Sequence, residues 1–216
     1  MSIRIDTLNK PVSLVLLAGG RASRMGGRNK ALLRVKGAPI IKNIISELKP
    51  LFENVVIIAN DKAPYKNLGL AAYEDIIPGR GPLSGIHSSL LNTKSYYNFV
   101  VACDMPYVEP KLARHMLNKL QDGYEVIACK IRGRYEPLFA IYGKGCISAI
   151  EEQLATADTK VTRFFSKVRV KTISEKEVTK IDPELKTFRN INTVREYENM
   201  LGDPKDFNNY ARSAHF

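Results

Sequence analysis

Glycine and cationic residues are concentrated in one short stretch, residues 17–30 (LAGGRASRMGGRNK), directly after the apolar run 12–17. Glycine lets backbone N–H groups approach a ligand closely, and the neighbouring cations add positive charge. A buried strand that ends in such a loop indicates an anion-binding site. Neither GxGxxG nor a glycine-lysine-Ser/Thr triplet is present, which disfavours a dinucleotide fingerprint and a Walker loop. A turn that only bends the chain would not need this charge. The residues concerned are Gly19, Gly20, Gly26, Gly27, Arg21, Arg24, Arg28 and Lys30.

A carboxylate, Asp104, follows a second apolar run, residues 98–103, and precedes Met105 and Pro106. At the end of a central strand it would face the crevice beside the glycine loop, where a hard cation is needed. The alternative is a helix N-cap. Glu109 is nearer to the next helix and is the better candidate for that role. Asp104 is therefore predicted to bind the metal.

Two further polar residues are candidates for ligand binding, one at the end of a predicted strand and one before a glycine-rich turn. Asn60 comes after the apolar run 54–60, and Asp75 precedes the segment PGRGPLSG. In open α/β sheets ligands bind at the carboxyl ends of strands. On spacing alone Asn60 is better explained as a turn former, and Asp75 could simply be a cap or a solvated turn residue. His87, on the helix expected after this turn, is predicted to be a surface residue.

The elements that must position these residues form an α/β pattern. The apolar runs at 12–17, 54–60 and 98–103 do not alternate, which is typical of parallel strands covered on both faces. Helical spacing at 40–48 and short loops predict a single doubly wound, mostly parallel sheet, with a Rossmann-like order of strand, helix and strand. Further strands are predicted at 124–130, 132–142 and 168–173, and further helices at 110–120, 145–155, 159–167 and up to Leu201.

Composition limits the class of protein. With 216 residues and 44% hydrophobic content, residues 1–201 are predicted to form one domain, followed by a polar tail at 202–216. The net charge of +11 suits a polyanionic partner: nucleotide, phosphorylated cofactor, nucleic acid or anionic membrane. Three cysteines without CxxC spacing indicate neither a disulfide framework nor a zinc site. We expect a cytoplasmic protein without membrane association.

The motifs taken together resemble a known family. Residues 17–30 resemble the nucleotidyltransferase loop LAGGxxxRMGxxK, and within that superfamily the chain looks most like the molybdenum cofactor guanylyltransferases, over residues 13–201. CDMP, the acid followed by GPLSG, and NINT at 190–193 resemble further motifs of that family in the same order. The resemblance implies nucleotide contacts from Leu17, Ala18, Gly19 and Gly20, phosphate contacts from Lys30 and Arg24, Mg²⁺ on Asp104, nucleoside contacts from Asn60 and Asp75, and a cofactor site edged by Asn190 and Asn192.

The resemblance implies transfer of GMP from GTP to the terminal phosphate of molybdenum-loaded molybdopterin, with release of pyrophosphate. A phosphate monoester has a second pKa near about 6, so the nucleophile is largely dianionic at neutral pH and needs no general base. Charge neutralisation and positioning are what the protein must supply. Expected partners are GTP, the molybdopterin and other cofactor-biosynthesis or delivery proteins, without nucleic acid. Two positions affect how closely the chain follows the family pattern. Asn29 replaces the aspartate that many relatives have before the lysine. Gly19 agrees with the guanylyl branch, whereas the cytidylyl relatives have alanine at this position.

Three alternatives remain. The first is a related nucleotidyltransferase that transfers a cytidylyl group to the same cofactor, or acts on a sugar phosphate or cobinamide phosphate. The second is a nucleic-acid-binding protein, suggested by the charge and ten tyrosines. It would predict a basic stripe interleaved with aromatic residues, whereas the densest cations lie inside a glycine loop. The third is a catalytically silent relative, which the presence of Lys30 and Asp104 disfavours.

Overall fold

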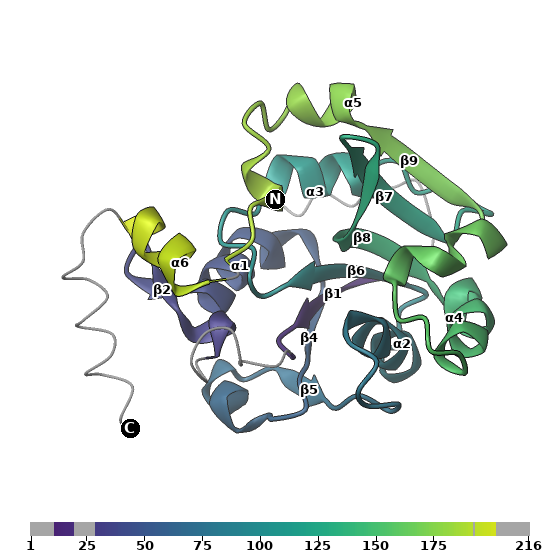
Figure 1. The fold of residues 1–216 in the computed structure, drawn as a ribbon, viewed down its shortest axis with the longest axis horizontal. Helices are drawn as coiled ribbons and strands as arrows, with labels where there is room; N and C mark the ends of the chain where they lie inside the picture. The colour runs from purple at the N-terminus through teal and green to yellow at the C-terminus, as the bar shows by residue number, and fades with distance from the viewer. Residues whose placement is uncertain (1–10, 20–28, 192, 202–216) are drawn as a thin grey trace.

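The computed structural model describes residues 11–19, 29–191 and 193–201. Its centre is a seven-stranded sheet with the order β5-β4-β1-β6-β8-β7-β9 (Figure 1). Strand β8 pairs antiparallel with both of its neighbours, and every other pairing in this sheet is parallel. The strands are β1 (Val12–Leu17), β4 (Asn54–Ile58), β5 (Ala71–Tyr73), β6 (Tyr97–Ala102), β7 (Val126–Ile131), β8 (Arg134–Gly143) and β9 (Val170–Ser174).

Alternate residues of the central strands face two separate helical layers. In β1, Leu14 and Leu16 pack into the core that contains α1 (Ile40–Leu48) and α3 (Pro110–Leu117). Val15 and Leu17 pack into the core that contains α2 (Pro82–Asn92) and α4 (Ile147–Leu154). Both faces of the strand are therefore buried, which explains its continuous apolar sequence. The predicted doubly wound, mostly parallel α/β sheet is confirmed.

The smaller elements lie around this sheet. A two-stranded hairpin, β2 (Arg34–Val35) and β3 (Ala38–Pro39), precedes α1, and short helices α5 (Glu175–Thr179) and α6 (Val194–Leu201) follow β9. Tyr197 of α6 is buried, and its hydroxyl donates to the Arg34 carbonyl at 2.7 Å, which brings α6 beside β2 (Figure 1). Residues 202–216 lie outside the described part, so the tail remains a prediction. Within the described residues, no helix combines the length and apolar character that a membrane span requires.

Two expectations from the sequence are corrected. The segment expected as a helix at 159–167 is a 3₁₀ helix at Val161–Lys167. Its three-residue turn stacks Val161 and Phe164 on the same buried face. His87, expected at the surface, is only 2% exposed because α4 packs against α2, and its Nε2 lies 3.1 Å from Oε1 of Glu151.

Replacement of Gly85 by alanine should destabilise the fold beside the candidate site. The added Cβ would lie 2.9 Å from Cδ2 of the buried Leu17 and 3.7 Å from Oδ1 of Asp75. Overpacking of this kind costs about 1–3 kcal/mol, measured as a lower midpoint in denaturant unfolding. Gly19→Ala is the control, because its Cβ would meet nothing within 4 Å among the described residues. Equal stability of the two variants would contradict this prediction.

Candidate active site

The carboxyl ends of β1, β4 and β6 meet at one edge of the sheet. Beyond the strands, the Ala18 N–H donates to the Ile58 carbonyl at 2.9 Å, and the Cys103 N–H donates to the Leu17 carbonyl at 3.0 Å. These bonds keep the start of the glycine loop between the ends of β4 and β6. As a result, the sequence-predicted residues from the three strands are brought to a common edge.

Lys30 and Asp104 come together at this edge. The Lys30 ammonium Nζ lies 3.4 Å from Asp104 Oδ2, and the two side chains are 26% and 21% exposed. The other carboxylate oxygen, Oδ1, is buried and has no hydrogen-bond partner among the described residues. A buried carboxylate oxygen without a donor suits a cation. The residues therefore fit Mg²⁺, which is bound in such sites through one or two carboxylates, waters and substrate phosphates.

Asn60 and Asp75 form a reciprocal pair at the ends of β4 and β5. The Asn60 amide donates to Asp75 Oδ2 at 2.8 Å, and the Asp75 N–H donates to Asn60 Oδ1 at 3.0 Å. Burial raises the pKa of Asp75, and the hydrogen bond from Asn60 opposes this rise. The pair presents carboxylate and amide groups at the sheet edge, where they can accept from hydroxyl or N–H groups of a ligand.

The turn before α2 needs its glycines. Gly79 and Gly81 have φ of +83° and +63°, and the ψ of −149° at Gly81 completes a conformation that is essentially restricted to glycine. Pro82 then begins the helix, and the positive end of the helix dipole favours an anion near this turn.

A buried tyrosine that the sequence analysis did not single out joins the two ends of the glycine loop. Tyr65, 1% exposed, donates its hydroxyl to the Ala18 carbonyl at 3.1 Å and accepts from the Asn29 amide at 2.8 Å. Asn29 Oδ1 in turn accepts from the Ala31 N–H at 3.1 Å, which caps the 3₁₀ helix carrying Lys30. Burial raises the pKa of Tyr65 to about 12, so the hydroxyl is a donor at neutral pH. An aspartate at position 29 would have no N–H to donate to the Tyr65 hydroxyl. The amide of Asn29 is therefore what lets the hydroxyl accept from residue 29 while it donates to the Ala18 carbonyl.

Replacement of Tyr65 by phenylalanine should lower the turnover number about 10-fold or more, because the loop end that carries Lys30 loses its link to Ala18. Tyr97→Phe is the matched control: Tyr97 is also buried and donates to one backbone carbonyl, that of Tyr124, at 3.0 Å. Each variant should lose about 1 kcal/mol of stability. Steady-state kinetics should separate them, and an equal loss of turnover in both would contradict a positioning role.

Not all sequence-predicted residues can be placed. Asn190 is exposed and precedes Ile191, whose N–H donates to the Asp104 carbonyl at 3.0 Å, so this segment lies beside the site. Gly20, Arg24 and Asn192 lie outside the described residues, and their roles remain predictions.

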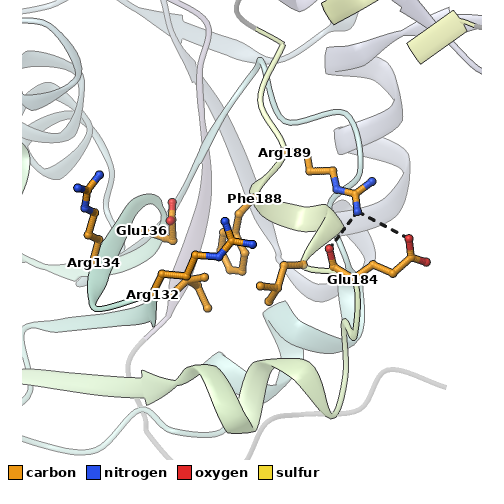
Figure 2. A pocket seen from close by; sticks show the side chains of 8 residues that line it. Arg132, Arg134, Glu136, Glu184, Phe188 and Arg189 are labelled. Atoms are coloured by element: carbon orange, nitrogen blue, oxygen red, sulfur yellow. Dashed lines mark hydrogen bonds and ion pairs between the residues drawn. The ribbon is translucent and has the colours of Figure 1, made fainter. Parts of the chain in front are cut away.

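A cavity of about 610 Å³ lies between the β7–β8 hairpin and residues 184–189 (Figure 2). In the β6–β8 ladder Val101 pairs with Phe139, so the start of β8 continues beyond the end of β6, on the same sheet edge as Asp104. The rings of Phe139 and Phe188 pack with centroids 6.1 Å apart. The cavity is lined by Ile131, Arg132, Arg134, Glu136, Glu184, Leu185, Phe188 and Arg189.

Backbone strain is concentrated at this cavity. Among the described residues, three that are not glycine have positive φ, and two of them, Arg132 at 49° and Leu185 at 52°, line the cavity. Arg132 and Gly133 form a two-residue hairpin turn in which both residues have positive φ. Such a conformation costs about 1–2 kcal/mol for a residue with a Cβ. The sequence analysis did not predict this cavity; an arginine at a position where such turns favour asparagine or glycine is a local signal for it.

The fold and the site define a class. A doubly wound sheet with a glycine loop after β1, a lysine that ends this loop and an aspartate after β6 is the arrangement of a nucleotidyltransferase. The profile of the family described as "MobA-like NTP transferase domain" matches residues 14–172. The chain belongs to this family and, within it, to the molybdenum cofactor guanylyltransferases.

The assignment to the molybdenum cofactor guanylyltransferases follows from sequence relatives. The chain is 40% identical over 191 residues to the "Probable molybdenum cofactor guanylyltransferase" of Clostridium perfringens, covering 88% of this chain and 96% of the relative. It is 42% identical over 179 residues to the protein of the same name from Pelotomaculum thermopropionicum, covering 83% and 86%. The crystal structure of molybdopterin-guanine dinucleotide biosynthesis protein A from Archaeoglobus fulgidus has the same fold, with a TM-score of 0.75 at 24% identity, covering 87% of this chain and 96% of that one.

Proposed function

We propose that the protein transfers GMP from GTP to the terminal phosphate of molybdenum-loaded molybdopterin, forming the guanine dinucleotide cofactor and pyrophosphate. The observation that carries this proposal is the meeting of Lys30 and Asp104 at 3.4 Å beside the start of the glycine loop. A cation and a partly buried carboxylate with one unpartnered oxygen suit a site that binds phosphates and a divalent metal together.

Each residue has a role in this proposal. The backbone of Leu17, Ala18, Gly19 and Gly20 holds the nucleotide phosphates, and Lys30 and Arg24 neutralise charge on the phosphates and on the leaving pyrophosphate. Asp104 holds Mg²⁺, which supplies further neutralisation of the phosphate oxygens. Asn60 and Asp75 contact the nucleoside, and Asn190 and Asn192 border the acceptor. The acceptor phosphate attacks in line as a dianion, so no residue has to remove a proton.

The proposal extends to partners and location. GTP and the molybdopterin are the substrates, and cofactor-biosynthesis or delivery proteins supply the acceptor and receive the product. We place the reaction in the cytoplasm, without a nucleic-acid partner. The three cysteines are buried as free thiols, and burial raises their pKa values, which suits a reducing compartment.

Thermal unfolding with GTP, CTP, ATP or UTP, each with and without Mg²⁺, tests the nucleotide choice. GTP at about 100 times its Kd should stabilise the protein by about 2.7 kcal/mol, and the stabilisation should depend on Mg²⁺. A shift with CTP in place of GTP would move the chain to the cytidylyl alternative. No shift with any of the four nucleotides would contradict the proposal. Pyrophosphate release in the presence of the molybdopterin then tests the transfer itself.

A further inference from the structure

We propose that Ile191 and the first turn of α6 form a brace that sets the spacing of Lys30 and Asp104, and that Tyr197 is the positioning residue at its far end. The brace keeps the Lys30 ammonium from closing onto the carboxylate that would hold Mg²⁺. This inference rests on the proposed function, because it concerns how the phosphate-binding and metal-binding groups of that site are spaced.

The separation of Lys30 and Asp104 is long for two opposite charges that face each other. Hydrogen bonds between an ammonium and a carboxylate usually measure about 2.7–2.9 Å, whereas Lys30 Nζ lies 3.4 Å from Asp104 Oδ2. Both side chains are mostly buried, so salt and water screen their attraction little. The gap is therefore held by the surrounding structure.

One end of the brace is fixed to the backbone of Asp104. The Ile191 N–H donates to the Asp104 carbonyl at 3.0 Å. The Ile191 side chain is 3% exposed and packs in the core that contains α1 and α3. Ile191 therefore anchors the chain where it leaves β6, at the residue that carries the carboxylate.

The other end of the brace is fixed four residues after Lys30. Tyr197 is 1% exposed, and its hydroxyl donates to the Arg34 carbonyl at 2.7 Å, across 163 residues of sequence. Arg34 begins β2, and the preceding residue, Leu33, donates its N–H to the Lys30 carbonyl at 3.1 Å. Figure 1 shows α6 beside β2. The position of β2, and of Lys30 before it, thus depends on Tyr197.

The start of α6 is stiff enough to connect these two ends. The Thr193 N–H donates to Glu196 Oε2 at 3.0 Å, and the Glu196 N–H donates to Thr193 Oγ1 at 3.1 Å. These reciprocal bonds form a capping box, which satisfies the first N–H groups of the helix. The Tyr197 N–H donates to the Thr193 carbonyl at 3.2 Å. Because this turn is tied to the backbone on both sides of the site, it can set the distance between the two charges.

Loss of the Tyr197 hydroxyl should let the two charges close. A closer ammonium competes with Mg²⁺, because both cations interact with the oxygens of the same carboxylate. We expect Tyr197→Phe to need about tenfold more Mg²⁺ than the unsubstituted protein for half of the thermal stabilisation by GTP. Tyr97→Phe is the matched control and should leave this requirement unchanged. Tyr97 is also buried and donates to a backbone carbonyl, that of Tyr124, but it begins β6, at the end of the strand away from Asp104.

The same Mg²⁺ titration in the Lys30→Met background tests whether Tyr197 acts through Lys30. Without an ammonium that can close onto the carboxylate, Tyr197→Phe should no longer change the Mg²⁺ requirement. A change of equal size in both backgrounds would overturn the brace, because Tyr197 would then act by another route. An equal rise in Tyr97→Phe would overturn it too, since loss of any buried tyrosine hydroxyl would have the same effect.

The brace and the proposed function fail in different ways. Thermal unfolding of each variant without nucleotide ensures that folded proteins are compared. If GTP with Mg²⁺ does not stabilise the unsubstituted protein, the transferase proposal fails and the brace fails with it. If the unsubstituted protein is stabilised but Tyr197→Phe keeps the normal Mg²⁺ requirement, the brace alone is refuted.

Discussion

Replacement of Asp104 by asparagine should lower GMP transfer by on the order of 100-fold or more while the protein remains folded. The asparagine keeps the volume of the side chain, but it lacks the negative charge that faces Lys30 and that suits a cation at the buried Oδ1. The loss should fall on the turnover number, because charge develops on the phosphates as the transition state forms. Pyrophosphate release at saturating GTP measures it.

One further measurement, made on two variants, distinguishes a metal role for Asp104 from a structural one. The part of the GTP stabilisation that requires Mg²⁺ should disappear in Asp104→Asn, and it should persist in Glu109→Gln. Glu109 lies five residues further on and only caps α3, by accepting from the Lys111 N–H at 2.9 Å. If Asp104→Asn retained its Mg²⁺ response and its turnover, the metal would have to bind elsewhere.

The sequence predicted the parts of the site that depend on local pattern. Continuous apolar runs identify buried parallel strands, and the topology of such a sheet requires their carboxyl ends to share one edge. Lys30 and Asp104 each lie just beyond such a run or its loop, so their meeting followed from chain order and sheet geometry. Asn60 and Asp75 were also placed at this edge, although their reciprocal hydrogen bonds were not foreseen.

The missed features depend on contacts between residues distant in the sequence. Tyr65 lies 47 residues from Ala18 and 36 from Asn29, and nothing in its own segment indicates that its hydroxyl reaches both. His87 was assigned to the surface because the packing of α4 over α2 cannot be seen in the spacing of either helix. To predict the cavity, one would also need to know that β8 runs antiparallel to β6. This direction places the N-terminal residues of β8, including Glu136, at the same sheet edge as the site.

Replacement of Lys30 by methionine should also reduce transfer about 100-fold, because a preorganised cation is lost at the phosphates. Lys62→Met is the matched control, since Lys62 is another lysine paired with a carboxylate, Glu74, at 2.9 Å, but it is exposed. It should change turnover little. Pyrophosphate release measures both variants, and a similar loss in each would show that general positive charge, and not this lysine, is what matters.

Combining the two site substitutions separates catalysis from folding. Lys30→Met leaves the Asp104 carboxylate partly buried without its nearby ammonium group, which should cost about 1 kcal/mol of stability. Adding Asp104→Asn removes that charge, so the double variant should recover stability in denaturant unfolding. Its turnover should stay low and should not fall by the product of the two single losses, because residues that act on the same transition-state charge are not additive. Losses that multiplied would show that Lys30 and Asp104 act at independent points, and the pairing at the sheet edge would then be structural.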